Sequence, residues 1–497
     1  MDDRPDNAPI RALRCADCER TDSLVTNLRP TSRIAIPAEA LVGFPDGVPR
    51  VPRGLSRRSL LASSAIGFAA IYSAAHLGWE SIWNAAVASA DAGPQNCLVC
   101  IYLQGGNDGL NTIVPVGEYS AYQTARANIA RVLGPSGGGQ VGTTTMLGTG
   151  GGLAFANPCV SGPGNNGDVK GFDTLYGDGS GGAGSDLAVF PAADYQPPDL
   201  SHFDSRDYWF AGALEQLETG WLGRWLDSFG SSSNPLQAIT LGSTLSKQIR
   251  TSSAPVCAIS SLSSTAFQIQ GTSVDANLQV ANLASVPFDA ANVALGRSRS
   301  IYGETVEVSN RLSGLNPGPP GTGYPTDPSG LVANLQLAAT LLGAGLGTRV
   351  ITIDWGSFDT HGDQITTQDP QLAVLSSALA AFKNDLIGRG IEQNVVTLVF
   401  SEFGRRIASN DSAGTDHGAG GLVLVSGSSV NGGQAGEYPG VAPNEQDPNG
   451  DLVPITDFRT VYQALISEWL GGDPTAILPD GPFPGIQRYD GGTNLMK

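Results

Sequence analysis

The chain has 497 residues, of which 41% are hydrophobic and 15% charged, so it can bury one large core or two ordinary ones. Its formal net charge of −18 argues against nucleic acid and anionic membrane surfaces as partners. The 65 glycines follow no collagen-like period and instead predict many loops on a folded scaffold.

Residues 1–90 are predicted to be an export signal rather than part of the fold. A polar, proline-rich stretch leads to Arg57 and Arg58, and an apolar run and an Ala-Ser-Ala tripeptide at 88–90 follow. This order is typical of a twin-arginine signal cleaved after small residues. The apolar run approaches the length of a membrane span, so an uncleaved anchor is the alternative, but its serines and histidine favour cleavage. We therefore expect the twin-arginine machinery to export the chain to the periplasm or the cell exterior.

Residues 91–497 are expected to form one domain without a membrane span. Glycine-rich stretches interrupt this region at about 136–184, 313–330 and 427–451, where we expect insertions that run over the surface. The residues between them alternate short apolar runs with helical patterns, which predicts an α/β fold.

The cysteines of the predicted domain fall into two pairs. Cys97 and Cys100 are three residues apart on a predicted strand, so they point to opposite faces, and we expect buried thiols. Cys159 and Cys257 lie in polar stretches, where a disulfide is plausible in an exported chain. The sequence leaves their pairing open.

The first predicted strand, 98–103, runs into a glycine-rich turn that carries a single carboxylate, Asp108. In an α/β fold, ligands bind in the crevice outside the carboxyl ends of the strands. Asp108 is therefore a candidate metal ligand, and an ordinary turn residue is the alternative.

The next informative segment, 199–209, begins polar and becomes aromatic, as the start of a helix does. Free N–H groups and a partial positive charge at such a start favour a nucleophilic hydroxyl near a metal, which makes Ser201 a candidate. An ordinary N-cap is the alternative for Ser201. His202 is open to the same two interpretations, ligand or structural residue. The pattern also predicts strands at 187–190 and 238–241 and helices at 221–226, 331–342 and 456–470.

The stretch 349–363 holds the densest group of candidate ligands. A β-branched, apolar strand at 350–353 ends abruptly in polar residues, among them Asp354, Asp359 and His361. Turn-forming aspartates and a hydrogen-bonded surface histidine are the alternative.

A strand at 395–400 ends in Glu402, and Arg405 and Arg406 follow. The glycine-rich loop after them places Asp416 and His417 just before a strand at 422–425. Small residues on both sides would let these two side chains approach a ligand closely.

Four strand-associated turns thus carry carboxylates or imidazoles. Every histidine outside the predicted export signal lies in one of these turns or in the segment 199–209. Mixed oxygen and nitrogen donors suit zinc, manganese, iron or magnesium, and calcium is a further possibility. More than four candidates favour two metals. We therefore predict one or two divalent metal ions, of a kind that the sequence does not distinguish.

The motifs QGGNDGLNT, DLSHFDSRDYW, GSFDTHGDQ, SEFGRR and TDHGAGG, in this order, resemble the exported family known as domain of unknown function 1501. That family belongs with the alkaline-phosphatase-like superfamily of phosphatases, sulfatases and phosphodiesterases, whose sites hold two metals. The resemblance implies a three-layer α/β/α sandwich with a largely parallel sheet. No Cys-x-Pro-x-Arg motif is present, which disfavours a formylglycine sulfatase.

The resemblance also implies roles for single residues. Asp108 matches the first-strand ligand. Asp354 and Asp359 match the carboxylate pair of a central strand, with His361 as an accompanying ligand. His417 resembles the final histidine of the superfamily pattern, just before a strand towards the edge of the sheet. Glu402 stands where an Asp-His pair usually ends a strand, and Phe403 replaces the histidine. Whether a second metal binds is therefore left open by the resemblance. For the nucleophile, Ser201 ranks first and Thr112 second.

Together these features predict an exported, metal-dependent hydrolase of phosphate or sulfate esters that acts on a small anionic substrate. Arg405 or Arg406 would bind the remaining anionic oxygens; a solvated helix start paired with nearby acids is the alternative for both. A non-catalytic exported binding or surface-assembly protein on the same fold is the alternative function.

Overall fold

The computed structural model describes residues 95–133, 140–145, 152–161, 170–177, 185–232, 234–262, 312, 315, 321 and 323–497. The predicted export signal at 1–90 lies outside the described residues, and so do parts of the glycine-rich stretches at 136–184 and 313–330. Within the described ranges, no helix is both long and apolar enough to cross a membrane.

A large, mostly parallel sheet forms the centre of the described region, as the sequence predicts. Nine strands take part, and β13 alone among the described strands of this sheet runs antiparallel to both of its neighbours. From one edge to the other, the strands are β14 (Gly433–Gln434), β6 (Leu187–Asp194), β13 (Gly421–Ser426), β10 (Val395–Phe400), β1 (Cys97–Leu103), β9 (Val350–Trp355), β7 (Ala238–Leu241) and β8 (Cys257–Ile259), with β15 (Thr456–Asp457) paired to β6.

The central strands are apolar along their whole length because both faces of the sheet are covered. Every residue of β1 and of β10 is buried. Cys97 belongs to the core on one face and Cys100 to the core on the other, which confirms their predicted opposite orientations. Burial raises the pKa of the Cys97 thiol to about 12 and that of Cys100 still further, so both thiols are inert.

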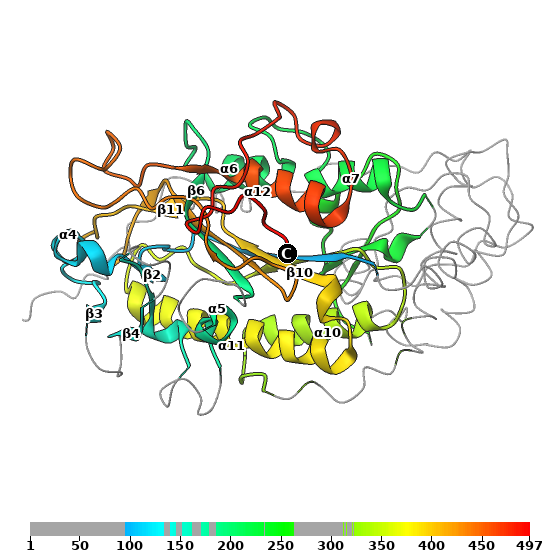
Figure 1. Ribbon diagram of the computed structural model, residues 1–497, viewed down its shortest axis with the longest axis horizontal. Coiled ribbons are helices and arrows are strands. Elements are labelled where there is room, and N and C mark those ends of the chain that lie inside the picture. The colour runs from blue at the N-terminus through cyan, green and yellow to red at the C-terminus, as the bar shows by residue number, and fades with distance from the viewer. Residues whose placement is uncertain are drawn as a thin grey trace, which may run out of the picture. The chain divides into compact units, whose positions relative to one another are not determined.

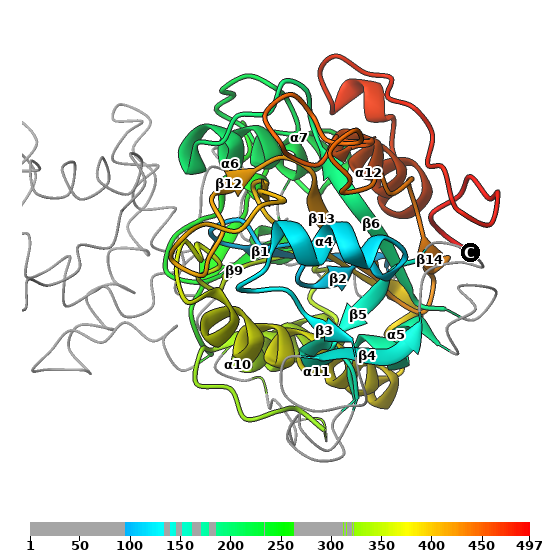
Figure 2. The ribbon, with the colours of Figure 1, turned by 90° about the vertical axis from the view of Figure 1, so that its left-hand side faces the viewer.

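Helices cover both faces of the sheet and give three layers (Figures 1 and 2). Aromatic packing fixes one of the helical layers, since the ring of Trp209 stacks on Phe400 of the sheet at 5.3 Å and on Phe458 at 4.3 Å. The layer on that face holds α6 (His202–Ala211), α7 (Trp221–Phe229) and α12 (Phe458–Ala464), and the other holds α5 (Phe172–Tyr176), α10 (Leu331–Gly343) and α11 (Gln364–Arg389).

The glycine-rich stretches are more structured than predicted. Residues 136–184 contribute strands and the helix α5, which packs on α11 and β6, and residues 427–451 contribute the edge strand β14. The surface-loop prediction was wrong there because short apolar runs between the glycines find partners on the domain. The smaller elements are β2 (Ile113–Val114), β3 (Val132–Leu133), β4 (Gln140–Thr145), β5 (Ala154–Ala156), β11 (Gly404–Arg405), β12 (His417–Gly418), α4 (Tyr119–Ala125), the 3-10 turns Val116–Glu118, Asn157–Cys159, Pro235–Gln237, Lys247–Ile249, Glu392–Asn394 and Pro474–Ala476, and a π-helical turn Leu465–Leu470.

The plausible disulfide between Cys159 and Cys257 is not formed. Both thiols are free and fully buried, Cys159 in a 3-10 turn packed on α11 and Cys257 in the edge strand β8. The polar character of their sequence neighbours was misleading, because both side chains point into the apolar core rather than into a loop.

The chain brings its polar turns together where the parallel strands end, a side of the sheet that is called the carboxyl edge below. Strands β1, β6, β9 and β10 are parallel, so their carboxyl ends meet there, and the antiparallel β13 places its amino end at the same edge. The segments that follow β1, β9 and β10 and the segment that precedes β13 are those in which the sequence predicts ligands. This edge therefore holds the candidate site.

Candidate metal centre

Asp359 lies at the centre of a cluster of three histidines. Its Oδ1 is 3.0 Å from Nε2 of His361 and 3.2 Å from Nε2 of His417, and these two nitrogens are 3.1 Å apart. Its Oδ2 is 3.5 Å from Nε2 of His202. The ligand atoms of His202, Asp359 and His417 all lie within 4.8 Å of one another. The structure thus joins residues from α6, the turn after β9 and β12.

Each histidine is oriented by an acceptor on its other ring nitrogen. Nδ1 of His202 is 2.8 Å from Oε1 of Glu402, Nδ1 of His417 is 2.8 Å from the carbonyl oxygen of Leu200, and Nδ1 of His361 is 3.0 Å from Oδ1 of Asp416. Carboxylates and carbonyls only accept, so each Nδ1 carries a proton. In the neutral rings the lone pairs are then on Nε2, and all three face Asp359.

This arrangement favours protons or a metal ion among its ligand atoms. Three nitrogen lone pairs and a carboxylate at 3.0–3.5 Å repel one another unless protons or a metal ion lie among them. Nε2 of His202 is buried and makes no hydrogen bond in the described structure. Donor atoms around a tetrahedral metal with bonds of about 2.0–2.1 Å are about 3.3 Å apart, close to the four distances given above. The ligand atoms of His202, Asp359 and His417 all converge, and His361 lies beside this group. The residues therefore fit a metal ion.

The pKa values show how strongly the cluster attracts positive charge. Burial opposes a charged ring at His202, but the neighbouring carboxylates of Asp359 and Glu402 outweigh it and raise the pKa of His202 to about 9. Asp359 raises the pKa of His361 too, whereas burial lowers that of His417. Burial would raise the pKa of Asp359, but the three histidines and Arg405 hold it far below its usual range.

The family model described as "Protein of unknown function (DUF1501)" matches residues 195–465, more than half of the chain. The chain belongs to this family. The matched region contains all four residues of the cluster and leaves out the turn after β1. No curated protein matches the chain.

In this DUF1501 protein, Glu402 supports the centre. It is 1% exposed, and besides His202 its oxygens accept from the backbone N–H groups of Gly105, at 2.9 Å, and Gly106, at 3.1 Å. Both glycines have positive φ, and a Cβ on Gly105 would lie 2.4 Å from the backbone nitrogen of Asp359. Glu402, predicted as a ligand, therefore holds His202 and the turn after β1 in place.

Phe403 forms a wall of the cluster. Its ring is fully buried, with its centroid 4.4 Å from that of His417 and 5.0 Å from that of His202. An aromatic ring offers no ligand atom, so it closes one side of the cluster to water and to a second metal. Its contribution as a wall was not evident from the sequence, which marked the position only as a missing histidine.

Arg405 is a structural residue rather than a free anion-binding group. Its side chain is fully buried and donates to the carbonyl oxygens of Gly106, at 2.8 Å, and Thr415, at 2.9 Å, and to Oδ1 of Asp359, at 2.7 Å. A guanidinium whose donors are occupied in this way cannot also bind a substrate. These contacts favour a structural role over the predicted anion-binding role, and the sequence does not reveal that loop carbonyls surround the side chain.

Asp108 belongs to a separate buried cluster. Its Oδ1 accepts from the backbone N–H groups of Leu110 and Asn111, at 3.0 and 3.2 Å, and its Oδ2 accepts from Arg126 and Gln364. Both oxygens are satisfied by donors, and the carboxylate is 1% exposed. These contacts favour the alternative interpretation of Asp108 as a structural turn residue, because the guanidinium of Arg126 supplies the positive charge beside it.

The remaining predicted residues lie around the cluster rather than in it. Thr112 is buried and donates to the backbone oxygen of Asp108 at 2.7 Å, which leaves it no nucleophilic role. Ser201 caps α6 by accepting from the backbone N–H of Asp204, as its alternative interpretation predicts. Asp416 orients His361, and the side chain of Arg406 donates to the carbonyl oxygen of Asn449 at 3.1 Å.

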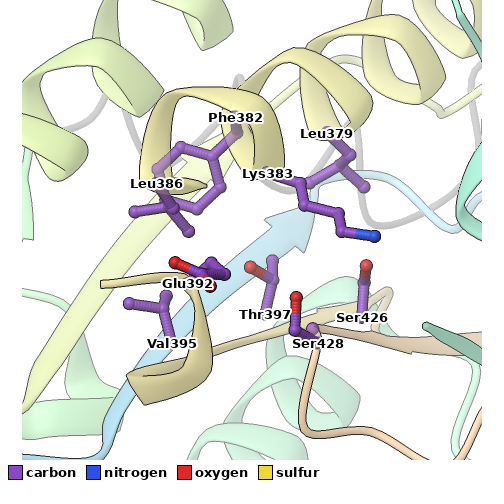
Figure 3. Close-up of a pocket in the computed structure, with 10 residues that line it drawn as sticks. Leu379, Phe382, Lys383, Leu386, Glu392, Val395, Thr397, Ser426 and Ser428 are labelled. Carbon is purple, nitrogen blue, oxygen red and sulfur yellow. The ribbon is translucent and has the colours of Figure 1, made fainter. Parts of the chain in front are cut away.

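Asp354 lies at the end of β9, exposed, on the face of the sheet that α6 covers. It is not among the residues whose ligand atoms converge. A pocket elsewhere in the described structure contains no predicted site residue and lies at the opposite edge of the sheet, where β10 begins and β13 ends (Figure 3). Its lining residues are Leu379, Phe382, Lys383, Leu386, Glu392, Val395, Thr397, Ser426, Gly427 and Ser428.

Proposed function

We propose that this DUF1501 protein is an exported, metal-dependent hydrolase of phosphate or sulfate esters, and that His202, Asp359, His361 and His417 hold its metal. The observation that carries the proposal is the convergence of three imidazole lone pairs on one carboxylate at the carboxyl edge of the sheet. When bound there, a divalent ion would polarise an ester oxygen and lower the pKa of a water molecule.

The donor set favours one transition metal. Three nitrogens and a carboxylate suit zinc or a neighbouring first-row ion, whereas magnesium and calcium prefer oxygen ligands throughout. Asp108 is paired with Arg126, and Phe403 stands where a further histidine ligand would be required. Both observations support one metal ion per chain rather than two.

A water molecule, rather than a side-chain hydroxyl, is the nucleophile in this proposal. Thr112 is buried and hydrogen-bonded, and Ser201 caps a helix. Water adds to the phosphorus or sulfur atom, the ester oxygen leaves with a proton as an alcohol, and inorganic phosphate or sulfate remains. Glu402 and Arg405 keep His202 and Asp359 in position during this reaction.

The remaining parts of the proposal concern ancestry and location. A mostly parallel sheet with helices on both faces and ligands at its carboxyl edge supports kinship with the alkaline-phosphatase-like superfamily. The twin-arginine pair at 57–58 supports export through the twin-arginine machinery to the periplasm or beyond. That pathway suits a protein whose metal is inserted before transport.

The test is hydrolysis by the purified full chain. Metal content is measured first, and release of the phenol from aryl phosphates and aryl sulfates is then followed with and without added zinc or manganese. We expect one metal per chain and metal-dependent turnover that His417→Ala abolishes. Turnover that persists in fully metal-free protein would refute the proposal.

One observation favours a second candidate, a non-catalytic binding or surface-assembly protein with a structural metal. Both Thr112 and Arg405, which were predicted to act on substrate, are fully committed to bonds within the protein. This candidate predicts a tightly bound metal that raises the melting temperature, together with no hydrolysis of any ester in the panel.

A further inference from the structure

We propose that Arg206 binds the anionic group of the ligand at this centre. The inference rests on the proposed function, because it assigns the residue that recognises the phosphate or sulfate of the ester. Arg206 lies four residues after His202 on α6, so the two side chains are neighbours on one face of the helix. A guanidinium presents paired N–H donors that match the oxygens of phosphate and sulfate.

Contacts along α6 locate Arg206 at the carboxyl edge of the sheet. One residue earlier, the hydroxyl of Ser205 donates to the backbone oxygen of Glu402 after β10. One turn later, the ring of Phe210 packs edge-on against Tyr102 of β1, with centroids 4.9 Å apart. The helix therefore runs across the ends of β10 and β1, directly above the residues that support the cluster.

The strand β9 carries a negative charge within the electrostatic reach of Arg206. Asp354 of β9 is paired in register with Tyr102, and both side chains lie on the face that α6 covers. The positive charge of Arg206 acts on both of these groups. Asp354 is exposed and lies in β9, just before the turn that carries Asp359.

The donors of Arg206 are available to a ligand. Among the described residues, its guanidinium makes no hydrogen bond or ion pair and only lies over the ring of Phe203, 5.8 Å from the centroid. Arg126 and Arg405, by contrast, are fully buried and donate to protein oxygens. A half-buried cation with free donors, one helical turn from a metal-ligating histidine, is suited to hold the charged end of a substrate.

The test measures binding of inorganic phosphate and of sulfate to the metal-loaded full chain by calorimetry at pH 8. Arg206→Gln should raise the dissociation constant of the anion by about 10- to 100-fold, the range for loss of a charged hydrogen-bonding partner, with metal content unchanged. Asp354→Asn should tighten anion binding, because it removes a negative charge from the same space. Arg250→Gln, which removes an exposed arginine beside Glu218, is the matched control and should change the constant less than twofold.

Arg206→Lys keeps the charge but loses the paired donors, so we expect an affinity between those of the wild type and Arg206→Gln. This variant also tests the site if Arg206→Gln does not fold. An unchanged affinity in both Arg206 variants would overturn the inference and leave the proposed function standing. If the Arg206 variants lose the metal as well as anion binding, Arg206 stabilises the metal centre rather than binding the anion, and the inference is overturned. If the metal-loaded wild-type protein binds neither anion, the inference and the ester-hydrolase proposal both fail.

Discussion

Two aspartates at the same edge of the sheet, Asp108 fully buried and Asp359 partly buried, have opposite surroundings. Asp108 receives four N–H donors, two from the backbone and one each from Arg126 and Gln364. Asp359 faces three imidazole nitrogens and forms an ion pair with Arg405. A carboxylate at a strand's end can therefore accept a metal only where its partners also bring lone pairs. Where they bring protons, the same carboxylate is part of the scaffold.

The largest effect is expected at Asp359. Asp359→Ala removes the carboxylate on which all three histidines converge, so we expect the variant to lose its tightly bound metal entirely. Elemental analysis of the purified protein checks this, with Asp411→Ala, an exposed acid in the loop before β12, as the control. Full metal content in Asp359→Ala would assign the metal to another site.

Breaking the other cluster should cost stability instead of metal. Arg126→Met leaves Asp108 buried without its cation, which should lower the free energy of unfolding by about 3–5 kcal/mol. Urea unfolding of the metal-free protein measures the change, and the metal content of the folded fraction should stay the same. Asp108→Asn in the Arg126→Met background should recover part of the loss. A metal deficit in Arg126→Met would show that the two clusters are coupled.

Glu402→Gln should weaken metal binding without abolishing it. A glutamine cannot accept from His202 and from the N–H groups of Gly105 and Gly106 at once, since one of its two head atoms is a donor. Loss of such an orienting partner typically lowers metal affinity about 10- to 100-fold. Competition with a chelator measures the affinity. Asp416→Asn is the matched comparison and should cost less, because Asp416 is 57% exposed.

The two forms of the protein should respond to pH in opposite directions. In the metal-free protein the pKa of His202 is raised from 6.5 to about 9, so the stability this histidine contributes is complete below pH 6.5 and is lost as the pH rises through 9. Metal must displace that proton, so affinity should rise about tenfold per pH unit over the same interval. Melting temperatures at pH 6.5, 7.5 and 9 with and without metal test both trends. Parallel trends would mean that His202 is not a ligand.

The smallest effect is expected at Ser201. Ser201→Ala removes an N-cap of α6 and should cost about 1 kcal/mol, whereas Ser201→Asp should retain the cap. Thermal unfolding measures the difference. Metal content and any ester hydrolysis should be unchanged, so hydrolysis lost from a metal-replete Ser201→Ala protein would identify Ser201 as the nucleophile.

The sequence alone predicted the parts of this architecture that depend on local pattern. Apolar β-branched runs located β1, β9 and β10, and the rule that ligands gather at carboxyl ends located the edge on which His202, Asp359, His361 and His417 meet. The histidines were informative because so few are present and all of those after residue 90 lie in the motifs.

What the sequence could not supply were partners distant along the chain. Asp108 is bonded to Gln364, 256 residues away, and Arg405 to the carbonyl of Gly106, 299 residues away. Neither separation leaves a local signature, so a scaffold carboxylate and a ligand carboxylate have the same appearance in the sequence. The same limit explains why Arg206, which sits in a motif already recognised, was not distinguished from its neighbours.

The antiparallel direction of β13 has a consequence for the order of events during folding. Because β13 enters the sheet from the carboxyl edge, the segment just before it brings His417 to the centre. This segment is synthesised more than 200 residues after His202. Contacts so distant along the chain form late, since their loop-closure cost must be met first. Metal loading therefore marks a nearly finished molecule, and a chain truncated before β12 would lack the centre altogether. In the proposed export of the folded chain, the bound ion would distinguish complete molecules from incomplete ones.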